Sequence, residues 1–429
     1  MVQHYLAQPV GRVAGSITVP GDKSISHRAL MLGGMAHGNT DITGFLASED
    51  CLATLRALRA LGVHIDQHDA NHLTVHGRGP SALHGAGQAL DMGNAGTAIR
   101  LFMGLLSGQS FDSTLIGDSS LMKRPMERVA GPLRQMGARI DTRDGRPPVI
   151  IHGDSRLHGI DYTLPMASAQ VKSALLLAAL SAEGVTRVTE PAITRDHTER
   201  MLGGFGVQLQ REGLSVALPG RQPLQGVPVQ VPGDFSSAAF FIVAGCLAAQ
   251  DGLTIRNVGI NPTRTGLLDM LRLMGADLRV TPAGEGPEPM ADITVRAAAL
   301  RGIEVPEPLV SLAIDEFPVF FIAAAAAEGE TVVRGAAELR VKESDRLAVM
   351  AEGLRALGIE CELLADGMRI RGGRMGGGRI NSHGDHRIAM AFAVASTRAS
   401  DAIHIDDVTN VATSFPGFPA IARSVGLRL

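Results

Sequence analysis

The sequence has too few of some residue types to fit several classes of protein. Tryptophan is absent from its 429 residues and aromatic residues make up only 3%, which argues against the stacking platforms that bind single-stranded nucleic acid. The 40 lysines and arginines do not exceed the 43 aspartates and glutamates, so the basic excess typical of nucleic-acid binders is missing too. The three cysteines, Cys51, Cys246 and Cys361, lack metal-ligand spacing, and we expect buried free thiols in a reducing compartment.

Long apolar runs are also missing. The N-terminal residues MVQHYLAQPVGRVAG contain no apolar run of signal-peptide length. The longest apolar runs, near residues 238–249 and 317–327, are too short to span a bilayer, and we expect both to form buried helices. Since 45% of the residues are hydrophobic and 19% are charged, the chain can bury large cores. The sequence therefore predicts a cytoplasmic protein that binds neither nucleic acid nor membranes.

Six steps of the form apolar–glycine–apolar divide the chain into six repeats. Glycine is favoured just past a helix end because the backbone there often turns left-handed. Each repeat reads as helix, strand, helix, strand, strand, which is an α/β folding unit and is longer than a solenoid repeat. The glycines are Gly62, Gly137, Gly206, Gly275, Gly358 and Gly426.

The first and fourth repeats begin with similar sequences. VPGDKSISHRALMLGGMA at residues 19–36 matches VPGDFSSAAFFIVAGCLA at residues 231–248. The match predicts a domain boundary near each, with three repeats in each domain. We therefore expect one domain over residues 21–231 and a second formed by residues 1–20 and 232–429.

A basic helix start in the first repeat is typical of an anion site. We expect Ser24 or Ser26 to cap a helix over residues 28–35. A helix start offers free N–H groups and partial positive charge, and Lys23 and Arg28 add full charges. A P-loop is excluded because its glycine–lysine spacing is missing. The alternative is an exposed helix start with solvated cations.

The second and third repeats offer similar helix starts. DMGNAGTA, before a helix from Ile99, has small residues that let a ligand approach the backbone. KRPM follows, with Pro125 expected in the first turn of another helix. SAQVKS supplies neutral donors and Lys172, which is either a salt-bridged surface residue or a site residue. TRDHTE supplies Arg195, and we expect its two acids to cap the next helix.

Acidic residues mark the helix starts of the fifth repeat. Asp315 and Glu316 precede an apolar run, where they suit a raised pKa and general-base work or, alternatively, helix capping. In LRVKESDR, Lys342, Glu343 and Arg346 could supply a cation, a proton and a carboxylate clamp, or form a solvated helix face.

The sixth repeat contributes HGDHR, with two histidines and one aspartate but no third ligand at metal spacing, so we expect no metal. The candidate cations exceed the need of one phosphate and suggest two anionic ligands. With few nucleophiles on offer, electrostatics and proton transfer should dominate the chemistry. These cations are Lys23, Arg28, Arg124, Arg195, Lys342, Arg346 and Arg387.

The combined motifs resemble those of the 5-enolpyruvylshikimate-3-phosphate (EPSP) synthase family from about residue 9 to residue 426. They are GDKSISHR, GNAGTAIR, KRPM, SAQVKSALLLA, TRDHTE, LRVKESDRL, DHRIAMAF and ATSFP. Three of them look like the branch that includes glyphosate-tolerant bacterial enzymes. The resemblance implies an α/β (α+β) fold of two domains, each of three βαβαββ folding units, with the active site in the cleft between them.

The family resemblance also implies the reaction. The enolpyruvyl group of phosphoenolpyruvate moves to the 5-hydroxyl of 3-phosphoshikimate, and phosphate leaves through a tetrahedral intermediate, as part of the shikimate pathway of aromatic amino-acid biosynthesis. No metal or organic cofactor takes part. The expected partners are these two small molecules, and we expect a monomer.

Site residues carry over by their motifs. For 3-phosphoshikimate they are Lys23, Ser24, Arg28, Ser168, Ala169, Gln170, Arg195, Asp315 and Lys342. For phosphoenolpyruvate they are Lys23, Gly96, Arg124, Gln170, Glu343, Arg346 and Arg387. The resemblance makes Asp315 the base for the 5-hydroxyl and Glu343 the proton donor to the methylene carbon, with Lys23 touching both substrates.

Two positions bear on how far the resemblance reaches. Ser414 stands where many members carry a lysine that helps to bind phosphoenolpyruvate. Gly96 leaves room where alanine crowds glyphosate in some members, so we expect intermediate or full sensitivity to this inhibitor.

Two alternative functions remain. One is the enolpyruvyl transferase that acts on UDP-N-acetylglucosamine, which needs a cysteine on a mobile loop. The other is a non-catalytic anion-binding protein, which would need neither Asp315 nor Glu343.

Overall fold

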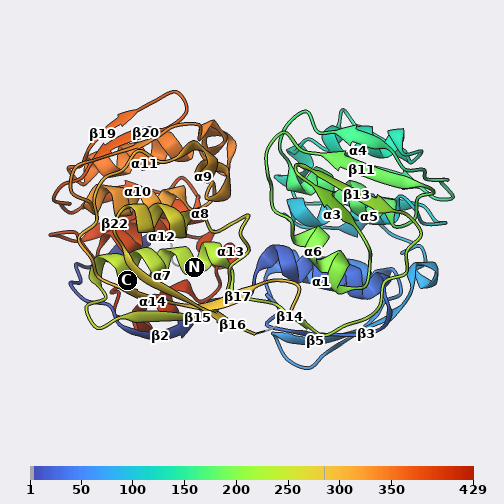
Figure 1. Cartoon of the computed structure of the whole chain (residues 1–429), viewed down its shortest axis with the longest axis horizontal. Helices are drawn as coiled ribbons and strands as arrows, with labels where there is room; N and C mark the ends of the chain where they lie inside the picture. Colours follow the sequence, from blue (N-terminus) through green and yellow to red (C-terminus); the bar gives the residue numbers. More distant parts are fainter. Residues whose placement is uncertain (1–3, 285) are drawn as a thin grey trace. The chain divides into compact units, whose positions relative to one another are not determined.

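The computed structural model describes residues 4–284 and 286–429, which fall into two compact units (Figure 1). Residues 21–231 and 286–288 form one unit, and the remaining described residues form the other. We call them the 21–231 unit and the 232–429 unit. Each has its own hydrophobic core.

The secondary structure alternates between helices and short strands along the whole chain. The strands are β1 His4–Ala7, β2 Gly15–Thr18, β3 His37–Thr43, β4 His64–Gln67, β5 His72–Arg78, β6 Leu90–Asp91, β7 Ser113–Ile116, β8 Arg139–Arg143, β9 Arg146–His152, β10 Asp161–Thr163, β11 Val185–Thr189, β12 Gln210–Glu212, β13 Ser215–Pro219, β14 Val229–Gln230, β15 Leu253–Gly259, β16 Asp277–Ala283, β17 Met290–Arg296, β18 Glu330–Val333, β19 Glu360–Leu363, β20 Met368–Arg371, β21 Gly378–Asn381 and β22 Ile403–Asp406. The α-helices are α1 Lys23–Met35, α2 Glu49–Ala60, α3 Gly96–Leu106, α4 Glu127–Gln135, α5 Ala169–Ala179, α6 His197–Gly204, α7 Phe235–Ala248, α8 Gly266–Leu273, α9 Glu307–Leu312, α10 Phe317–Ala326, α11 Arg346–Ala356, α12 His386–Ala395, α13 Val411–Ser414 and α14 Phe418–Ser424, and the 3-10 helices are η1 Pro80–Ala82, η2 Leu121–Lys123 and η3 Ala337–Val341.

The described strands form six small sheets that correspond to the six predicted repeats. Four share one arrangement, in which a parallel pair is followed by a strand with antiparallel partners on both sides: β14-β3-β5-β4, β6-β7-β9-β8, β10-β11-β13-β12 and β2-β15-β17-β16. The sheets β21-β22-β1 and β18-β20-β19 are three-stranded versions. In the former, the N-terminal strand β1 supplies the antiparallel partner of β22.

The predicted helix-ending glycines all adopt the left-handed backbone. Gly62, Gly137, Gly206, Gly275, Gly358 and Gly426 have φ between 81° and 107°. Other residues rarely adopt this conformation, since a Cβ atom there meets the following carbonyl. The six-fold repetition read from the sequence is confirmed at the backbone level.

The chain passes from one unit to the other at its two VPGD turns. Strand β2 pairs with β15 in the 232–429 unit, yet the next helix, α1, belongs to the 21–231 unit. Strand β14 pairs with β3 in the 21–231 unit, and the next helix, α7, belongs to the 232–429 unit. Each VPGD turn therefore connects a strand in one unit to a buried helix in the other.

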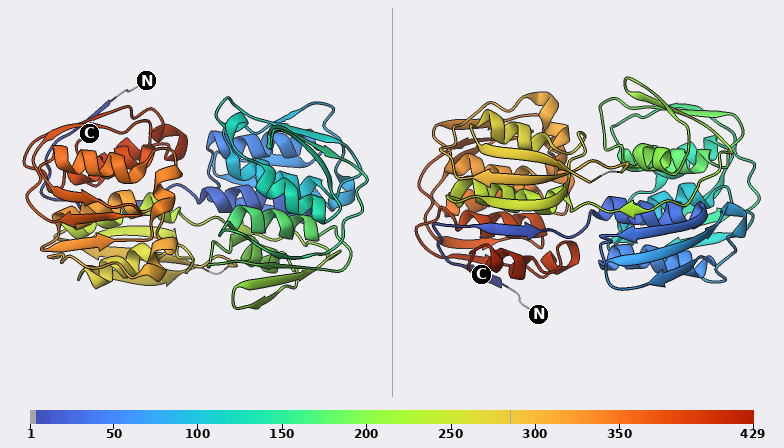
Figure 2. Two further views of the ribbon diagram at one scale, coloured as in Figure 1. Left: turned by 90° about the horizontal axis from the view of Figure 1, so that it is seen from above. Right: turned by 60° about the horizontal axis from the view of Figure 1, so that its bottom comes forward.

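Buried helices lie inside each unit. Figure 1 shows α10, α12 and α7 stacked between β19 and β20 on one side and β15 and β2 on the other, and Figure 2 gives two further views of these layers. Every residue of α7 is buried, as are all but the last of α10. Both apolar runs are thus buried helices, as predicted. Within the described residues, no helix combines the length and apolarity needed to cross a membrane.

Three predicted helix starts were placed wrongly. Helix α1 begins at Lys23 rather than at residue 28, because the Asp22 carboxylate, not Ser24 or Ser26, caps it by accepting the N–H of Ile25 at 2.9 Å. Helix α3 begins at Gly96 rather than at Ile99. Pro125 lies before α4, which begins at Glu127. The earlier starts place more motif residues on the first turns of α1 and α3.

The closest approach of α3 to α5 yields a prediction about stability. A Cβ atom at Gly104 would lie 2.0 Å from the carbonyl oxygen of Ala174, so Gly104→Ala should push the helices apart. We expect a loss of about 1–3 kcal/mol in the free energy of unfolding, as for other overpacked cores. The control Gly203→Ala has open space around its Cβ and should leave the melting temperature equal or slightly higher. Equal melting temperatures for both variants would contradict close packing at Gly104.

Candidate active site

Lys23 is the first residue of α1 and forms an ion pair with Asp50 of α2. The Lys23 side chain is 37% exposed, whereas that of Asp50 is 7% exposed. The ammonium group therefore has a buried counter-ion on one side and access to solvent on the other. An anion that reaches the start of α1 would share Lys23 with Asp50.

Arg28 is buried among neutral groups. Its Nε donates to Thr198 Oγ1 at 2.7 Å, its Nη2 to Ser173 Oγ at 2.9 Å, and its Nη1 to the carbonyl oxygen of Ser24 at 2.9 Å. Among the described carboxylates, none forms an ion pair with it. Burial lowers the pKa of Arg28 to about 10, although Glu199 and Asp22 act in the opposite direction. The proposed alternative of a solvated cation therefore does not hold for Arg28.

Arg100, on α3, is a second buried arginine with neutral partners, and the sequence interpretation missed it. Its Nη1 donates to the carbonyl oxygen of Gly96 at 2.9 Å and to Gln170 Oε1 at 2.8 Å. Burial, followed by the charges of Arg128 and Arg124, lowers its pKa to about 9. Arg28 and Arg100 both donate to the carbonyl four residues earlier in their helices, a repetition in GDKSISHR and GNAGTAIR that could have revealed Arg100.

Gly96 and Arg124 lie side by side at the start of α3. A Cβ atom on Gly96 would be 2.6 Å from Nη1 of Arg124 and 3.2 Å from Nη1 of Arg100. Nη2 of Arg124 donates to Asn94 Oδ1 at 2.6 Å. Glycine is needed here because two guanidinium groups occupy the space that a side chain would fill.

Gln170 joins the start of α5 to that of α3. Besides accepting from Arg100, it donates through Nε2 to Thr97 Oγ1 at 3.1 Å. Ser168 caps α5 by accepting the N–H of Val171 at 3.4 Å, and Ala169 is the first helical residue. The 21–231 unit thus brings Gly96, Arg124 and Gln170 together at the starts of α3 and α5.

Lys172 forms ion pairs but lies in the protein interior, not on the surface. Its Nζ lies 2.6 Å from Glu190 Oε2 and 2.7 Å from Glu199 Oε1, and its side chain is 0% exposed. Glu199 therefore pairs with Lys172 instead of capping α6. Asp196 also forms no side-chain cap and binds Arg200 and Arg211 at 2.8 and 2.6 Å. The two predicted caps were wrong because both acids pair with cations: Glu199 with Lys172 of α5, and Asp196 with Arg200 of α6 and with Arg211.

Arg346, at the start of α11, is surrounded by carboxylates. Its Nε donates to Asp385 Oδ2 at 2.9 Å and its Nη2 to Glu343 Oε2 at 2.6 Å, and its Nη1 lies 3.4 Å from Asp315 Oδ1. Burial lowers the pKa of Arg346, but the carboxylates outweigh burial and raise it above its usual value. Burial raises the pKa of Glu343, but the charges of Arg346, His386 and Arg387 together outweigh burial, so the net shift is downward.

Asp315 lies between several cations at the start of α10. Lys342 Nζ is 3.6 Å from its Oδ1, the same oxygen that Arg346 approaches. Arg387 Nη1 donates to the Asp315 backbone carbonyl at 3.1 Å and lies 3.9 Å from Glu316 Oε1. The 232–429 unit thus gathers Asp315, Lys342, Glu343, Arg346 and Arg387 in one cluster, which the sequence interpretation had only as separate motifs.

The HGDHR segment also belongs to this cluster. Asp385 caps α12 by accepting the N–H of Arg387 at 3.0 Å, and it accepts from Ser344 Oγ at 3.0 Å as well as from Arg346. Burial, followed by the charge of Arg387, lowers the pKa of His386 to about 4, so this imidazole is neutral at pH 7. Asp385 is the second functional residue that the sequence interpretation left without a role.

The remaining candidate residues occupy the ends of elements. Arg195 is half-buried between β11 and α6, and its charge is among those that lower the pKa of Arg28. Ser24 is half-buried in the first turn of α1, and Ser414 ends α13 and is half-buried.

The buried Lys172 generates a prediction about stability and pH. Lys172→Met leaves Glu190 and Glu199 without their cation, and we expect the free energy of unfolding to fall by about 3–5 kcal/mol at pH 7.5. The loss should shrink at lower pH, where protonation removes the uncompensated charges. Lys123→Met, at an exposed lysine, is the control and should change it by less than about 0.5 kcal/mol. Chemical unfolding at several pH values measures both, and equal effects of the two variants would refute the assignment.

The chain is similar to known proteins over almost its whole length. Residues 7–421 match the family model described as EPSP synthase (3-phosphoshikimate 1-carboxyvinyltransferase). A 3-phosphoshikimate 1-carboxyvinyltransferase of Alkalilimnicola ehrlichii is 58% identical, over 98% of this chain and 95% of that protein. One of Methylococcus capsulatus is 56% identical, over 99% of this chain and 97% of that protein.

The fold is also similar to that of a solved structure. The EPSP synthase of Acinetobacter baumannii matches with a TM-score of 0.94 and 52% identity, over 99% of this chain and 98% of that one. The predicted α/β fold of the enolpyruvyl transferases is therefore confirmed. The chain belongs to the EPSP synthase (3-phosphoshikimate 1-carboxyvinyltransferase) family.

Proposed function

We propose that this chain transfers the enolpyruvyl group of phosphoenolpyruvate to the 5-hydroxyl of 3-phosphoshikimate and releases phosphate. The observation that carries the proposal is the similarity to 3-phosphoshikimate 1-carboxyvinyltransferases over nearly the full length of both chains. The arginines at the helix starts support it, because two phosphorylated substrates need several fixed cations. The expectations of a monomer, a cytoplasmic location and glyphosate sensitivity stay predictions.

The 21–231 unit supplies the groups proposed for 3-phosphoshikimate. Arg28 has only neutral hydrogen-bond partners, so a phosphate would be its first anionic partner. Charge-assisted hydrogen bonds of this kind contribute about 1.5–3 kcal/mol each. Lys23 and the N–H groups at the start of α5 add to the attraction. The full proposed set is Lys23, Ser24, Arg28, Ser168, Ala169, Gln170 and Arg195, with Asp315 and Lys342 for the ring hydroxyls.

Phosphoenolpyruvate is the proposed ligand of a second set of cations. In the 21–231 unit, Gly96 lets the Arg124 guanidinium lie against the start of α3. Arg100 links this helix start to Gln170 by a hydrogen bond. Lys23, Arg346, Arg387 and Glu343 complete the proposed set. With Ser414 in place of lysine, these cations hold phosphoenolpyruvate without a contribution from that position.

Asp315 is the proposed base for the 5-hydroxyl. Arg346 at 3.4 Å and Lys342 at 3.6 Å stabilise its carboxylate, which can then accept the hydroxyl proton as the oxygen attacks C2 of phosphoenolpyruvate. Positioned proton transfer of this kind contributes about 10²–10⁴-fold to the rate.

Glu343 is the proposed carrier of the proton that joins and leaves C3. Arg346 lowers the pKa of Glu343, which by itself favours the carboxylate and opposes proton donation. Phosphoenolpyruvate brings negative charge to Arg346 and so raises the pKa of Glu343 towards that of a donor. After C3 has been protonated, the carboxylate takes a proton back as phosphate leaves and the double bond re-forms.

A phosphate-release assay with each acceptor tests the proposed reaction. We expect turnover with 3-phosphoshikimate and phosphoenolpyruvate, and none with UDP-N-acetylglucosamine. The cysteines agree with this choice, since burial raises the pKa values of Cys51 and Cys246 to about 12 and keeps both as thiols. Turnover with UDP-N-acetylglucosamine instead would overturn the proposal.

Two variants separate catalysis from binding. Asp315→Asn and Glu343→Gln should each lower kcat by about 10²–10⁴-fold, while calorimetry still detects 3-phosphoshikimate binding. The exposed Asp401 provides a control, since Asp401→Asn should keep full activity. Near-normal turnover in both test variants would remove the chemistry assigned to Asp315 and Glu343, whereas the non-catalytic anion-binding protein predicts no turnover even in the unmodified chain.

Gly96→Ala tests the proposed phosphoenolpyruvate contact. The new Cβ atom would lie 2.6 Å from Nη1 of Arg124 and displace this guanidinium. We expect the KM for phosphoenolpyruvate to rise by roughly tenfold, equivalent to the loss of about 1.4 kcal/mol of binding, and inhibition by glyphosate to weaken. The KM for 3-phosphoshikimate should stay within about twofold of the original value, less than 0.5 kcal/mol. An unchanged KM for phosphoenolpyruvate would place this substrate elsewhere.

A further inference from the structure

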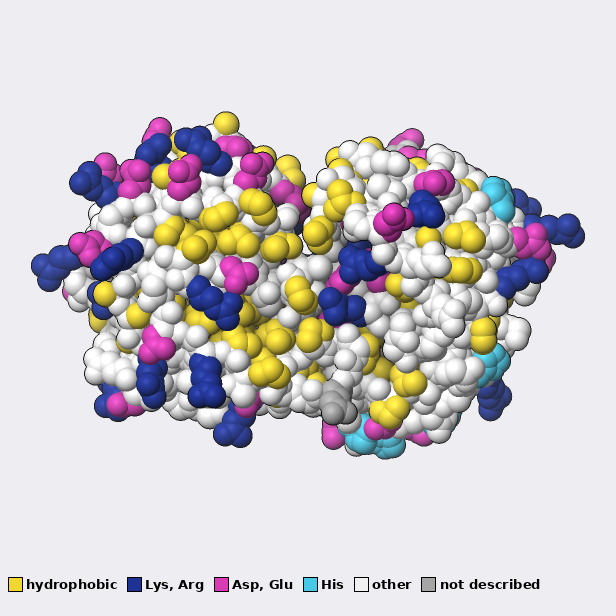
Figure 3. All heavy atoms as spheres, in the orientation of Figure 1, with side chains coloured by type: hydrophobic (Ala, Val, Ile, Leu, Met, Phe, Trp, Pro, Cys, Tyr) yellow, Lys and Arg dark blue, Asp and Glu magenta, His cyan; other side chains and the backbone are white. Residues whose placement is uncertain are grey.

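The outer face of one sheet in the 21–231 unit is rich in histidine. Four of the 14 histidines, His64, His68, His72 and His76, fall at every fourth position around the β4–β5 hairpin. In β5, Leu73 and Val75 are buried in the core, so the alternate residues point outwards. Figure 3 shows histidine side chains gathered at the surface of this unit.

Three of the outward side chains form a compact set of potential metal ligands. His64 Nε2 lies 3.2 Å from Asp66 Oδ1, and His76 Nε2 lies 2.8 Å from Asp66 Oδ2. His64 faces His76 directly across the β4–β5 pair, with ring centroids 4.9 Å apart. One ligand atom from each of the three residues lies within 4.8 Å of the other two.

The spacing suits a tetrahedral transition-metal ion. Zinc binds histidine nitrogen and carboxylate oxygen at about 2.0–2.2 Å, which places neighbouring ligand atoms about 3.3 Å apart. Each imidazole nitrogen lies near this distance from one carboxylate oxygen of Asp66, His64 at 3.2 Å from Oδ1 and His76 at 2.8 Å from Oδ2. Side-chain exposures of 30–68% leave all three residues accessible to an ion from solvent. A water molecule can take the fourth position.

Asn39 orients one of these imidazoles for metal binding. Its Oδ1 lies 3.0 Å from His76 Nδ1, from the position directly opposite on β3. In a neutral imidazole that donates through Nδ1, the lone pair is on Nε2, and Nε2 points at Asp66. His76 therefore faces an oxygen atom at each ring nitrogen. Either a second proton or a metal ion at Nε2 satisfies this arrangement, and metal-binding histidines are commonly held by such a partner.

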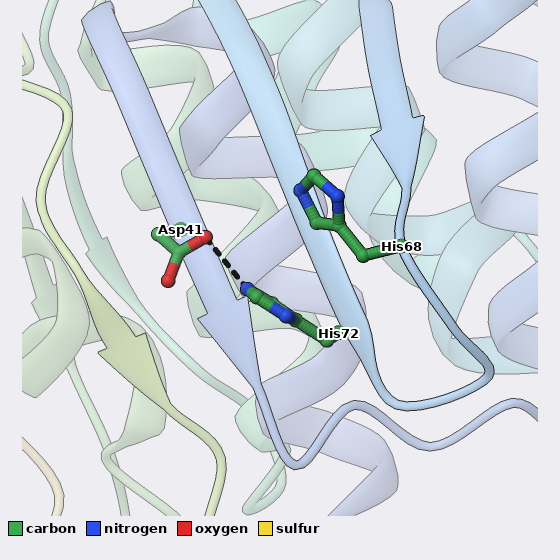
Figure 4. Close-up of side chains that lie close together, drawn as sticks. All are labelled: Asp41, His68 and His72. Carbon is green, nitrogen blue, oxygen red and sulfur yellow. Dashed lines mark hydrogen bonds and ion pairs between the residues drawn. The ribbon is translucent and has the colours of Figure 1, made fainter.

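A neighbouring cluster of the same composition lacks this feature. His72 Nε2 lies 2.9 Å from Asp41 Oδ1 (Figure 4), and Thr74 Oγ1 donates to the same oxygen at 3.0 Å. Since its hydroxyl proton goes to Asp41, Thr74 accepts from His68 Nε2 at 2.8 Å. Asp41, His68, His72 and Thr74 thus satisfy one another through a closed hydrogen-bond network, which an ion would have to break.

We propose that His64, Asp66 and His76 bind a divalent transition-metal ion such as Zn²⁺ on the outer face of the sheet, with Asn39 as a positioning residue. The ion would link β4 to β5, two strands that are joined by a hairpin. Since these ligands are assembled only in the folded chain, the ion would stabilise the fold by mass action. None of the three residues belongs to the proposed substrate sites, so the ion would act on stability and not on turnover.

Titration calorimetry of the full chain, without an affinity tag and freed of metal by a chelator, tests this site with Zn²⁺ at pH 7.5. We expect one ion per chain and a rise in melting temperature when Zn²⁺ is added. His76→Ala and His64→Ala should each weaken binding by more than about 100-fold and abolish this rise, whereas Asn39→Ala should weaken binding by about 10–100-fold.

His72→Ala is the matched control, because it removes a histidine from the neighbouring cluster on the same strand. We expect it to bind Zn²⁺ as the unmodified chain does. All four variants should release phosphate at the unmodified rate, which shows that they fold. The proposal is overturned if the unmodified chain does not bind Zn²⁺, or if His72→Ala removes binding while His64→Ala and His76→Ala keep it.

Discussion

The buried arginine at a helix start is the interaction on which the 21–231 unit is organised. A buried guanidinium must find hydrogen-bond acceptors, and Arg28 and Arg100 find only hydroxyl, carbonyl and amide oxygens. Their burial lowers both pKa values, which records the cost of holding a cation there. Packing of the surrounding helices offsets this free-energy cost. Because the hydrogen-bond partners of both arginines are neutral, their positive charge is not balanced by a directly bonded carboxylate.

In the 232–429 unit, the buried arginine at the start of α11 has the opposite environment. Arg346 has three carboxylates around it, and their charges raise its pKa despite burial. A cluster of this kind holds acids and cation together in one network, so a change at one member alters the others. The same six-fold architecture thus holds buried arginines with neutral partners in one unit and a mixed acid–cation cluster in the other.

The two VPGD segments share one backbone arrangement but differ in the residue that follows the helix cap. The two VPGD turns both lead into a buried helix capped by an aspartate, Asp22 before α1 and Asp234 before α7. Lys23 follows the first cap, and Phe235, which is buried, follows the second. The turn and the cap belong to the fold, and the residue after the cap distinguishes a helix start with a partly exposed cation from one with a buried aromatic ring.

The sequence by itself determined the features that depend on neighbouring residues. The six glycine turns, the apolar helices and the basic helix starts each follow from a short stretch of chain, because caps, turns and periodicity act over a few residues. Only the tertiary structure decided the partners that come from distant segments. Arg28 donates a hydrogen bond to Ser173, 145 residues away, and Arg100 donates one to Gln170, 70 residues away. Lys172 is buried and forms ion pairs with Glu190 and Glu199. Which charges are buried, paired or left for a ligand depends on packing, and packing brings together residues whose spacing in the chain carries no local signal.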